Sequence, residues 1–240
     1  MRVRGHDRPV FPRFSELSPG TVNRDLQVHT TWTDGTASVG ALLQRADELQ
    51  LAELAFTEHA RATSDYFPAF FEEVRRLRQR SSVRVYAGFE LKVVDLTGRL
   101  DATDDMLEAA ELVLGSVHTF PGGQGRRYAK DLSPEEAAAT ELELSRAMLQ
   151  RGKADVLAHC GGMSLRAHGS FPEDHFVELM RLCTETGTAF EINASYHEQI
   201  LDALLELLRV HDPPVSIGSD AHALTELGRC RDLLRTRLTL

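Results

Sequence analysis

The chain has 240 residues and a mass of 26.7 kDa, the size of one domain or of two small ones. Hydrophobic residues make up 42% of it and charged residues 26%, which excludes a disordered tail and a disulfide-stabilised miniprotein. The net charge of −9 argues against a protein that coats nucleic acid through a broad basic surface. Ten histidines stand out in so acidic a chain, and they direct the search for function.

Cysteine usage and the amino terminus indicate the compartment. Cys160, Cys183 and Cys230 are far apart in the sequence and form no Cys-x-x-Cys pair, as is typical of a reducing environment. Residues 1–13 carry arginines and prolines without the apolar segment of a signal peptide. No apolar stretch approaches the roughly 18 residues that a membrane helix needs. The sequence therefore predicts a cytoplasmic protein without a membrane segment, and it leaves the oligomeric state open.

Strand-like and helix-like segments alternate along the chain after an amino-terminal arm over residues 1–22, so residues 23–240 are expected to form one domain. The expected strands are Asn23–His29, Glu53–His59, Val83–Leu91, Leu112–His118, Ala154–His159, Thr188–Asn193 and Val215–Asp220. The expected helices are Ser38–Gln50, Phe67–Arg80, Asp104–Ala110, Pro134–Arg151, Pro172–Thr186, His197–His211 and Leu224–Thr236, with a small hairpin at Lys92–Leu100. Such α/β alternation requires right-handed crossovers and a parallel sheet, either open or closed into a barrel.

Polar side chains stand at or just after the end of every expected strand. They are Gln27, His29, Asp34, His59, Glu90, His118, His159, Asn193, Asp220 and His222. In a parallel barrel these strand ends converge on the face that holds the active site. Imidazoles mixed with carboxylates suit zinc, manganese or iron, and this set exceeds what one tetrahedral ion needs. We therefore expect a cluster of two or three divalent ions, with Glu90 well placed to bridge them.

The other histidines have an ordinary interpretation. A single histidine after a strand is usually a loop residue or a hydrogen-bonded core residue, whereas five of them at five strand ends are not explained by chance. His6, His175 and His211 are expected to be ordinary surface or helix residues. His168 and His197 follow the fifth and sixth strands and are kept as further candidates for the pocket lining.

The motifs resemble those of the PHP (polymerase and histidinol phosphatase) superfamily. The similar segments are Asp25–Thr30 with Asp34-Gly35, Thr57–His59, Gly88–Glu90, His118, His159 and Asp220–His222, in the order of the family. The resemblance covers nearly the whole chain from about Asn23. It implies a distorted seven-stranded (β/α) barrel with a trinuclear metal cluster at the carboxyl ends of the strands. It also implies phosphoester hydrolysis.

Some positions depart from the family pattern. Most members have histidine where this chain has Gln27 and aspartate where it has Glu58. The segment around Gln27 is nevertheless similar to the PHP domain of bacterial family X DNA polymerases. An amide oxygen is a weaker zinc ligand than an imidazole, so one site is expected to be weakly occupied or tuned towards manganese. Cys160 stands where the family often has proline, and it is expected to be a small buried residue.

The resemblance also implies how the ligands are shared among three sites. His29, Glu90 and Asp220, with Gln27 as a further candidate, would form the first; Glu90, His118 and His159 the second; and Asp34, His59 and His222 the third. A hydroxide held between metal ions would attack phosphorus, which makes Glu90, His118, Asp220 and His222 the catalytic candidates. Asp25 is expected to orient a ligand from behind.

Substrate-binding candidates come from the loops at the same end of the sheet. Arg61 and Arg166 are each candidates for a bidentate phosphate contact, and Asn193 and Tyr196 are expected at the pocket rim. A glycine-rich loop that carries Arg126, Arg127 and Lys130 is expected to form either a mobile lid or a surface excursion.

Three functions stay open. The first is hydrolysis of a phosphomonoester of a small molecule, although residues 194–197 lack the arginine that histidinol phosphatases usually carry there. The second is a 3′–5′ exonuclease or nucleotide phosphoesterase acting on DNA or RNA ends, for which an aromatic content of 7% offers few bases a stacking partner. The third is a non-catalytic, metal-stabilised binding module, which the chemically competent ligand set disfavours.

Overall fold

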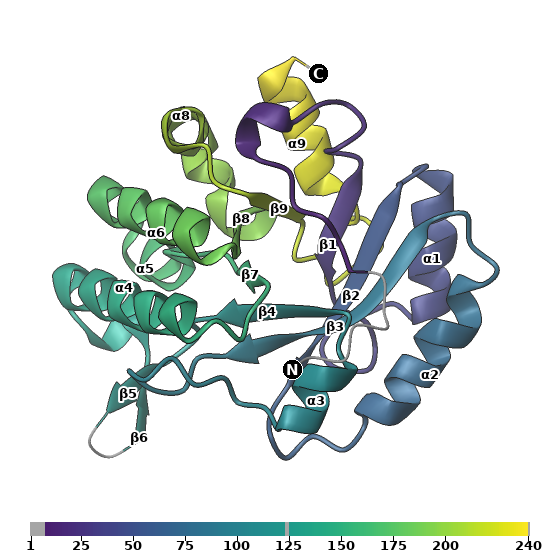
Figure 1. Ribbon diagram of the computed structural model, residues 1–240, viewed down its shortest axis with the longest axis horizontal. Coiled ribbons are helices and arrows are strands. Elements are labelled where there is room, and N and C mark those ends of the chain that lie inside the picture. The colour runs from purple at the N-terminus through teal and green to yellow at the C-terminus, as the bar shows by residue number, and fades with distance from the viewer. Residues whose placement is uncertain (1–7, 123–124, 240) are drawn as a thin grey trace.

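The computed structural model describes residues 8–122 and 125–239, and Figure 1 shows their arrangement. Seven parallel strands form one sheet in the order β1-β2-β3-β4-β7-β8-β9. Their bounds are β1 (Arg24–Val28), β2 (Glu53–Ala60), β3 (Arg84–Lys92), β4 (Leu112–Ser116), β7 (Val156–Leu157), β8 (Ala189–Asn193) and β9 (Val215–Gly218). The strands thus follow one another around the sheet in chain order, as they do in a (β/α) barrel.

The sheet closes at the carboxyl ends of its first and last strands. The N–H of His29 donates to the carbonyl of Ala221 at 2.9 Å, and the N–H of Ala221 donates to the carbonyl of Gln27 at 3.3 Å. Val28 and Ala221 form an isolated parallel bridge. The fold is therefore a nearly closed seven-stranded barrel. This confirms the prediction of an α/β barrel, and of the two arrangements that the alternation allowed, the closed barrel rather than the open sheet is observed. The segments that close it also carry ligand candidates.

Helices surround the barrel. They are α1 (Val39–Glu48), α2 (Phe67–Arg78), α3 (Asp104–Ala109), α4 (Pro134–Arg151), α5 (Gly162–His168), α6 (Glu173–Thr186), α7 (Ala194–His197), α8 (Leu201–His211) and α9 (Arg229–Leu238). Short 3₁₀ turns are η1 (Phe14–Glu16), η2 (Ala129–Asp131) and η3 (Glu198–Ile200), and a hairpin joins β5 (Phe120–Gly122) to β6 (Gly125–Arg127). In Figure 1, α1 and α2 flank β1–β3 on one side, and α4, α5, α6 and α8 lie on the other. Within the described ranges, no helix combines the length and the apolar character needed to cross a membrane.

Side-chain alternation along the strands separates two apolar layers. Phe89 and Leu91 of β3 pack in the outer layer against the helices, whereas Glu90 between them points the opposite way. The inner layer fills the barrel with Leu26, Ala55, Tyr86, Leu112, Leu114, Val156, Ala158 and Ala189, all buried. The interior is therefore a packed core near the amino ends of the strands, and it becomes polar towards their carboxyl ends, where Glu90 lies.

The amino-terminal arm packs against the base of the barrel. Arg8 forms an ion pair with Asp155, the residue before β7, at 2.6 Å. The carbonyl of Pro12 accepts the N–H of Val215 at 2.8 Å, and Phe11 packs against the inner apolar layer. Residues 8–22 therefore cover the end of the barrel opposite to the ligand candidates. The domain boundary expected at residue 23 stays a prediction.

Most element bounds differ from the sequence expectation by one or two residues, and larger differences occur at three helices. Helix α5 lies where a loop was expected after the fifth strand. The helix expected over 197–211 is divided by η3, so that α8 begins at Leu201. The last helix begins at Arg229 rather than Leu224, because Gly228 before it adopts a left-handed conformation with φ of 79°. The hairpin expected at Lys92–Leu100 is present, with Val93 and Leu100 bridged.

Candidate metal centre

The ligand candidates converge because parallel strands end at one edge of the barrel. His59 of β2 and Glu90 of β3 are paired in the register of the sheet, so their side chains emerge side by side. His118 and His159 follow β4 and β7, and the segment from Asp220 to His222 follows β9. Asp34 reaches the same place through a tight turn, in which the N–H of Gly35 donates to the carbonyl of Thr30 at 3.0 Å. A Cβ on Gly35 would lie 2.4 Å from the carbonyl oxygen of His29, so only glycine fits there.

Glu90 lies at the centre, and its two oxygens face different histidines. Its Oε1 lies 2.9 Å from Nε2 of His118 and 3.1 Å from Nε2 of His159. Its Oε2 lies 3.3 Å from Nε2 of His29, which is also 3.2 Å from Oδ1 of Asp220. A carboxylate whose oxygens point into two separate donor sets is arranged to bridge two metal ions.

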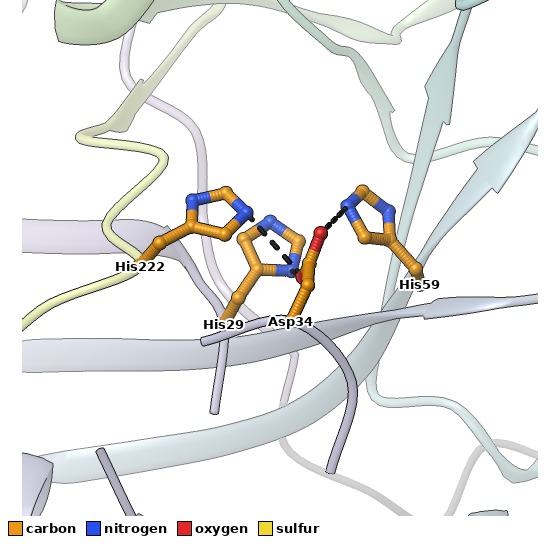
Figure 2. Close-up of side chains that lie close together, drawn as sticks. All are labelled: His29, Asp34, His59 and His222. Carbon is orange, nitrogen blue, oxygen red and sulfur yellow. Dashed lines mark ion pairs between the residues drawn. The ribbon is translucent and has the colours of Figure 1, made fainter. Parts of the chain in front are cut away.

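Figure 2 shows a third donor set, in which Asp34 lies between His59 and His222. Oδ2 of Asp34 is 3.3 Å from Nε2 of His59, and Oδ1 is 3.4 Å from Nε2 of His222. His29 lies beside them, with Nδ1 4.0 Å from Asp34. The side chain of Asp34 is 54% exposed, whereas those of His29 and Glu90 are buried. The three groupings expected from the sequence are thus each brought together, and the third is the most open.

Hydrogen bonds behind the cluster orient its members. Nδ1 of His222 donates to the carbonyl of Asp220 at 2.9 Å, which leaves Nε2 free for a metal. Asp25 accepts the N–H groups of Ser219 and Gly228, both at 2.8 Å, and so fixes the ends of the loop that carries Asp220. Asp25 therefore contacts the backbone around Asp220 rather than a ligand side chain, and the expectation that it orients a ligand stays a prediction.

Glu191 holds the backbone of His159, a role that the sequence analysis did not assign. Its Oε2 accepts the N–H of His159 at 2.7 Å. His159 and Asp220 are non-glycine residues with positive φ, 25° and 53°. Such backbone costs roughly 1–2 kcal/mol per residue, and the surrounding hydrogen bonds offset it. The alternation within Glu191-Ile192-Asn193 was a signal for this role, because it places both polar side chains inside the barrel.

The electrostatics of the metal-free site show how strongly it favours cations. Burial opposes protonation of both His29 and His159. For His29, the carboxylates of Asp220 and Glu90 outweigh this effect of burial. For His159, the carboxylate of Glu90 outweighs it. The pKa values rise to about 10 for His29 and about 9 for His159. Although burial works in the other direction, His118 and the other histidines hold the pKa of Glu90 well below its usual value. Burial lowers the pKa of His59 to about 4.

The donor set fits divalent metal ions. Both ring nitrogens of His29 and Nδ1 of His59 are buried without a hydrogen-bond partner among the described residues. Burying unpaired polar atoms costs free energy, so a metal ion bound by these nitrogens would account for their arrangement. Imidazoles and carboxylates in this proportion are the ligands of zinc, manganese and iron, as the sequence analysis expects. Eight of the nine expected ligands turn a donor atom into the cluster: His29, Asp34, His59, Glu90, His118, His159, Asp220 and His222.

Gln27 and Glu58, the two departures from the family pattern, are both buried and hydrogen-bonded. Nε2 of Gln27 donates to Oε2 of Glu90 at 2.9 Å, so the amide presents its donor rather than its oxygen to the cluster. Glu58 accepts the N–H of Thr30 at 2.9 Å, and burial raises the pKa of its carboxyl. Glu58 therefore supports the turn that carries Asp34.

A cavity of about 780 Å³ opens over the cluster. Arg166 of α5, Tyr196 of α7 and Lys130 of η2 line it, together with the ligands Asp34, His59, Glu90, His118, Asp220 and His222. Its remaining lining includes Tyr128, Met163, Ser195 and Glu226, which the sequence analysis did not single out. The predicted positions of Arg166 and Tyr196 beside the cluster therefore agree with the structure.

The predictions for Arg61 and Asn193 need correction. Arg61 is exposed after β2 and is not part of the cavity lining; its backbone N–H donates to Oγ of Ser64 at 3.0 Å. Asn193 is buried beneath the cavity rather than at its rim, and its side chain contacts Gln27 and Glu191. Neither side chain is part of the lining of this cavity.

Other expectations concern the remaining histidines and the glycine-rich loop. His197 is a structural residue: its Nδ1 accepts the N–H of Asn193, and its Nε2 donates to the carbonyl of Cys160 at 3.0 Å. His168 lies at the end of α5 and contacts the carbonyl of Ala129.

Of the cations in the glycine-rich loop, Lys130 lines the cavity and Arg126 lies 3.7 Å from Asp101. Arg127 is exposed, and residues 123–124 of that loop lie outside the described residues.

Four planar side chains are stacked from the cavity wall into the cluster. The guanidinium of Arg166 lies 4.3 Å from the ring centre of Tyr196. Tyr196 stacks on His159 with ring centres 4.4 Å apart, and His159 stacks on His118 at 5.2 Å. The stack places Arg166 on the cavity wall, with the ring of Tyr196 between its guanidinium and the second donor set.

Comparison with known proteins identifies the family. The sequence model of the family described as PHP domain matches residues 25–195, most of the chain. The chain belongs to the PHP family. This agrees with the resemblance seen in the motifs.

Relatives and a solved structure support the assignment. The chain is 25% identical over 219 residues to the DNA polymerase/3′–5′ exonuclease PolX of Bacillus subtilis, covering 87% of this chain and 35% of PolX. It is 27% identical over 163 residues to a probable phosphatase of Caldicellulosiruptor bescii, covering 64% of this chain and 59% of that protein. The chain therefore spans only about a third and three-fifths of these relatives. The histidinol phosphate phosphatase of Lactococcus lactis, complexed with zinc, L-histidinol and phosphate, has the same fold: its TM-score is 0.73 at 20% identity, over 90% of this chain and 92% of that one.

Proposed function

We propose that the protein hydrolyses a phosphomonoester of a small molecule with two or three divalent ions held at the cluster. The observation that carries this proposal is the position of Glu90, whose oxygens face two donor sets on the floor of a cavity walled by Arg166. Ions bound there would supply a hydroxide at neutral pH and stabilise the charge of the phosphate oxygens. Zinc, manganese and iron all suit the donor set.

The residues of this chain would share the remaining work. Arg166 and Lys130 are the cations of the cavity wall, and a guanidinium can contact two phosphate oxygens at once. Asp220 and His222 hold their side of the cluster, and the bond from Nδ1 of His222 to the carbonyl of Asp220 keeps the ring orientation fixed. Such preorganisation limits the rearrangement needed as charge develops on the phosphate.

The shape of the site favours a small substrate. A cavity of about 780 Å³ is within the range of small-molecule pockets. Both faces of Tyr196 are covered, one by His159 and the other by Arg166, so the ring has no free face for a base. Proteins that bind single strands depend on such stacking. We also propose a cytoplasmic location, which the three buried free cysteines support.

Action on DNA or RNA ends is the second candidate. It is favoured by the similarity to the 3′–5′ exonuclease PolX over most of this chain. The exposed Tyr128 at the cavity edge, with Lys130 beside it, offers an aromatic surface outside the stack. A non-catalytic binding module is the weaker alternative, because it would not explain why the ligand candidates converge around Glu90 beneath an open cavity.

A panel of substrates tests the proposal. Protein loaded with manganese or zinc is offered an aryl phosphate, histidinol phosphate, nucleotides and short single-stranded oligonucleotides, and phosphate release or strand shortening is measured. We expect turnover of one or more of the monoesters and little of the oligonucleotides. Turnover of oligonucleotides alone would favour the second candidate, and no turnover of any substrate by metal-loaded protein would contradict both.

Arg166→Ala separates the substrate contact from the metal centre. We expect KM for the best monoester to rise about tenfold or more, because a charged hydrogen bond to phosphate is lost, while the metal content stays unchanged. Arg61→Ala is the matched control, since this arginine lies at the same end of the barrel but outside the cavity lining. An equal rise in KM for both variants would contradict the role of Arg166.

A further inference from the structure

Gln27 occupies a position where the family pattern would place a metal-binding imidazole, yet its surroundings give it a different task. The side chain is fully buried at the end of β1, and both ends of its amide are engaged. Nε2 donates to Oε2 of Glu90 at 2.9 Å, and Oε1 accepts from Nδ2 of Asn193 at 2.8 Å. The amide therefore turns its NH₂ group, which cannot bind a metal ion, towards Glu90, and its oxygen towards Asn193.

Asn193 determines which way the amide of Gln27 points. Oδ1 of Asn193 accepts the N–H groups of Ser195 and Tyr196, at 2.9 and 3.1 Å, at the start of α7. Two N–H donors on one atom require that atom to be oxygen, so Nδ2 of Asn193 faces the barrel interior. It donates there to Gln27 and, at 3.1 Å, to Glu191.

Reversing the amide of Gln27 would create two unfavourable contacts. Its Oε1 would face the carboxylate oxygen of Glu90, and its NH₂ group would face the NH₂ group of Asn193. The pattern of donors and acceptors is therefore consistent in one orientation only. This orientation is set by backbone N–H groups of α7, which lies outside the cluster.

We infer that Gln27 is a positioning residue that holds Glu90 by hydrogen bonding and is not a metal ligand. Its donor contacts Oε2 of Glu90 and so stabilises the rotamer in which Oε1 faces His118 and His159. The same network reaches Tyr196, because Asn193 caps the helix that carries this wall of the cavity. The inference rests on the proposed function, since it concerns the metal centre that this function requires.

Replacing the amide by a side chain of similar length without a donor tests the inference. Zinc binding to Gln27→Met is measured by competition with a chelator, and the number of bound ions by elemental analysis. We expect the same number of zinc ions as in the wild type, bound about 10- to 100-fold more weakly at the sites that use Glu90, as for partners behind a ligand. Loss of one ion from the full complement would show that Gln27 is a ligand and would overturn the inference.

Controls separate this effect from a folding defect. Gln44→Met changes an exposed glutamine of α1 and should bind zinc as the wild type does. The thermal unfolding of each metal-free variant reports whether the barrel is intact. If the wild type itself binds less than one zinc ion under all loading conditions, the proposed function fails; if it binds zinc normally and Gln27→Met loses an ion, only the inference fails.

A variant of Asn193 tests the network without replacing any of the expected metal ligands. Asn193→Asp keeps the acceptor for the N–H groups of α7 but cannot donate to Gln27. We expect it to weaken zinc binding in the same direction as Gln27→Met, and the double variant to bind no more weakly than the more affected single one. Additive losses would show that Asn193 does not act through Gln27, which would contradict the network.

A crystal structure of the zinc-loaded wild type gives the most direct test, and it does not depend on the stability of any variant. We expect Nε2 of Gln27 to remain within hydrogen-bond distance of Glu90, with no ion near Oε1. An ion at the usual coordination distance of about 2.0–2.2 Å from Oε1 would overturn the inference.

Discussion

At the scale of the residue, the carboxylate of Glu90 connects most of the candidate site. It contacts His118 and His159 through one oxygen and His29 and Gln27 through the other. It is buried, yet the surrounding histidines keep its pKa well below its usual value. A buried carboxylate whose pKa is held low is suited to hold cations on both sides.

Glu90→Gln is expected to lower turnover by at least about 100-fold, because a neutral amide cannot bridge two cations. Bound metal should fall by at least one ion per chain, as measured by elemental analysis. Circular dichroism of the metal-free variant checks that the barrel is retained. Turnover within a few-fold of the wild type would contradict a bridging role for Glu90.

The affinity for zinc is expected to increase with pH. In the metal-free protein His29 and His159 have pKa values of about 10 and about 9, so both carry a proton at neutral pH that a metal must displace. For each displaced proton, the Kd for zinc should fall about tenfold when the pH rises by one unit. Two protons therefore give a fall of up to about 100-fold between pH 7 and pH 8. Competition titrations across this range measure it, and a Kd independent of pH would contradict the account.

The same protons affect the stability of the metal-free protein. The folded pKa values of these two histidines lie above the ordinary value of 6.5, so the folded state binds protons more tightly than the unfolded state. Their contribution to stability is fully present below about pH 6.5 and is lost as pH rises through 9 and 10. We expect the Tm of the metal-free protein to fall over this interval, and the zinc-loaded protein to show little of this change.

Prediction from sequence succeeded at residues whose position depends on strand ends. Parallel strands bring their carboxyl ends together whatever the intervening helices do, so His59, His118 and His159 could be placed without knowledge of packing. The orientation of Gln27 could not be predicted in this way. It is determined by Asn193, which lies 166 positions further along the chain, and by the backbone of α7.

At the scale of the element, α5 is a helix that could not be predicted from its own sequence. It has seven residues and begins after Gly161, so propensity alone does not favour it. Its first turn is stabilised by a residue of another helix: Glu141 of α4 is buried and accepts the N–H groups of Met163 and Ser164, at 3.1 and 2.9 Å. By contrast α4, whose cap Ser133 is adjacent in sequence, was predicted with its correct bounds.

Glu141→Ala is expected to destabilise the protein by about 1–3 kcal/mol, because it leaves buried N–H groups of α5 without acceptors. KM should also rise, since α5 carries Arg166 to the cavity. Urea unfolding and steady-state kinetics measure the two effects. Glu143→Ala, at an exposed position of the same helix, is the control, and equal behaviour of both variants would contradict the capping role.

At the scale of the whole molecule, the barrel has a structural end and a functional end. The arm residues Phe11 and Phe14 pack at the amino ends of the strands, whereas the cluster lies at the carboxyl ends. The sequence indicated an arm by its prolines but gave no sign that it packs against the barrel. The surface that the arm contacts is formed by the amino ends of strands from different parts of the chain. It exists only in the folded barrel, so no local segment of the sequence predicts it.

Phe14→Ala is expected to destabilise the protein by about 3–5 kcal/mol, as removal of a buried aromatic side chain usually does. The kinetic constants of the folded fraction should stay close to those of the wild type, because the change lies at the end opposite to the cluster. Chemical unfolding and kinetics below the transition measure this. Val10→Ala, at a position 77% exposed, should have little effect on either, and a large change in KM for Phe14→Ala would contradict the separation of the two ends.

The central claim is that the carboxyl ends of the strands form a multinuclear metal centre. Elemental analysis of protein stripped of metal, reloaded with zinc or manganese and freed of excess by gel filtration tests it most directly. The account predicts two or three ions per chain. Less than one ion per chain under every loading condition would contradict it.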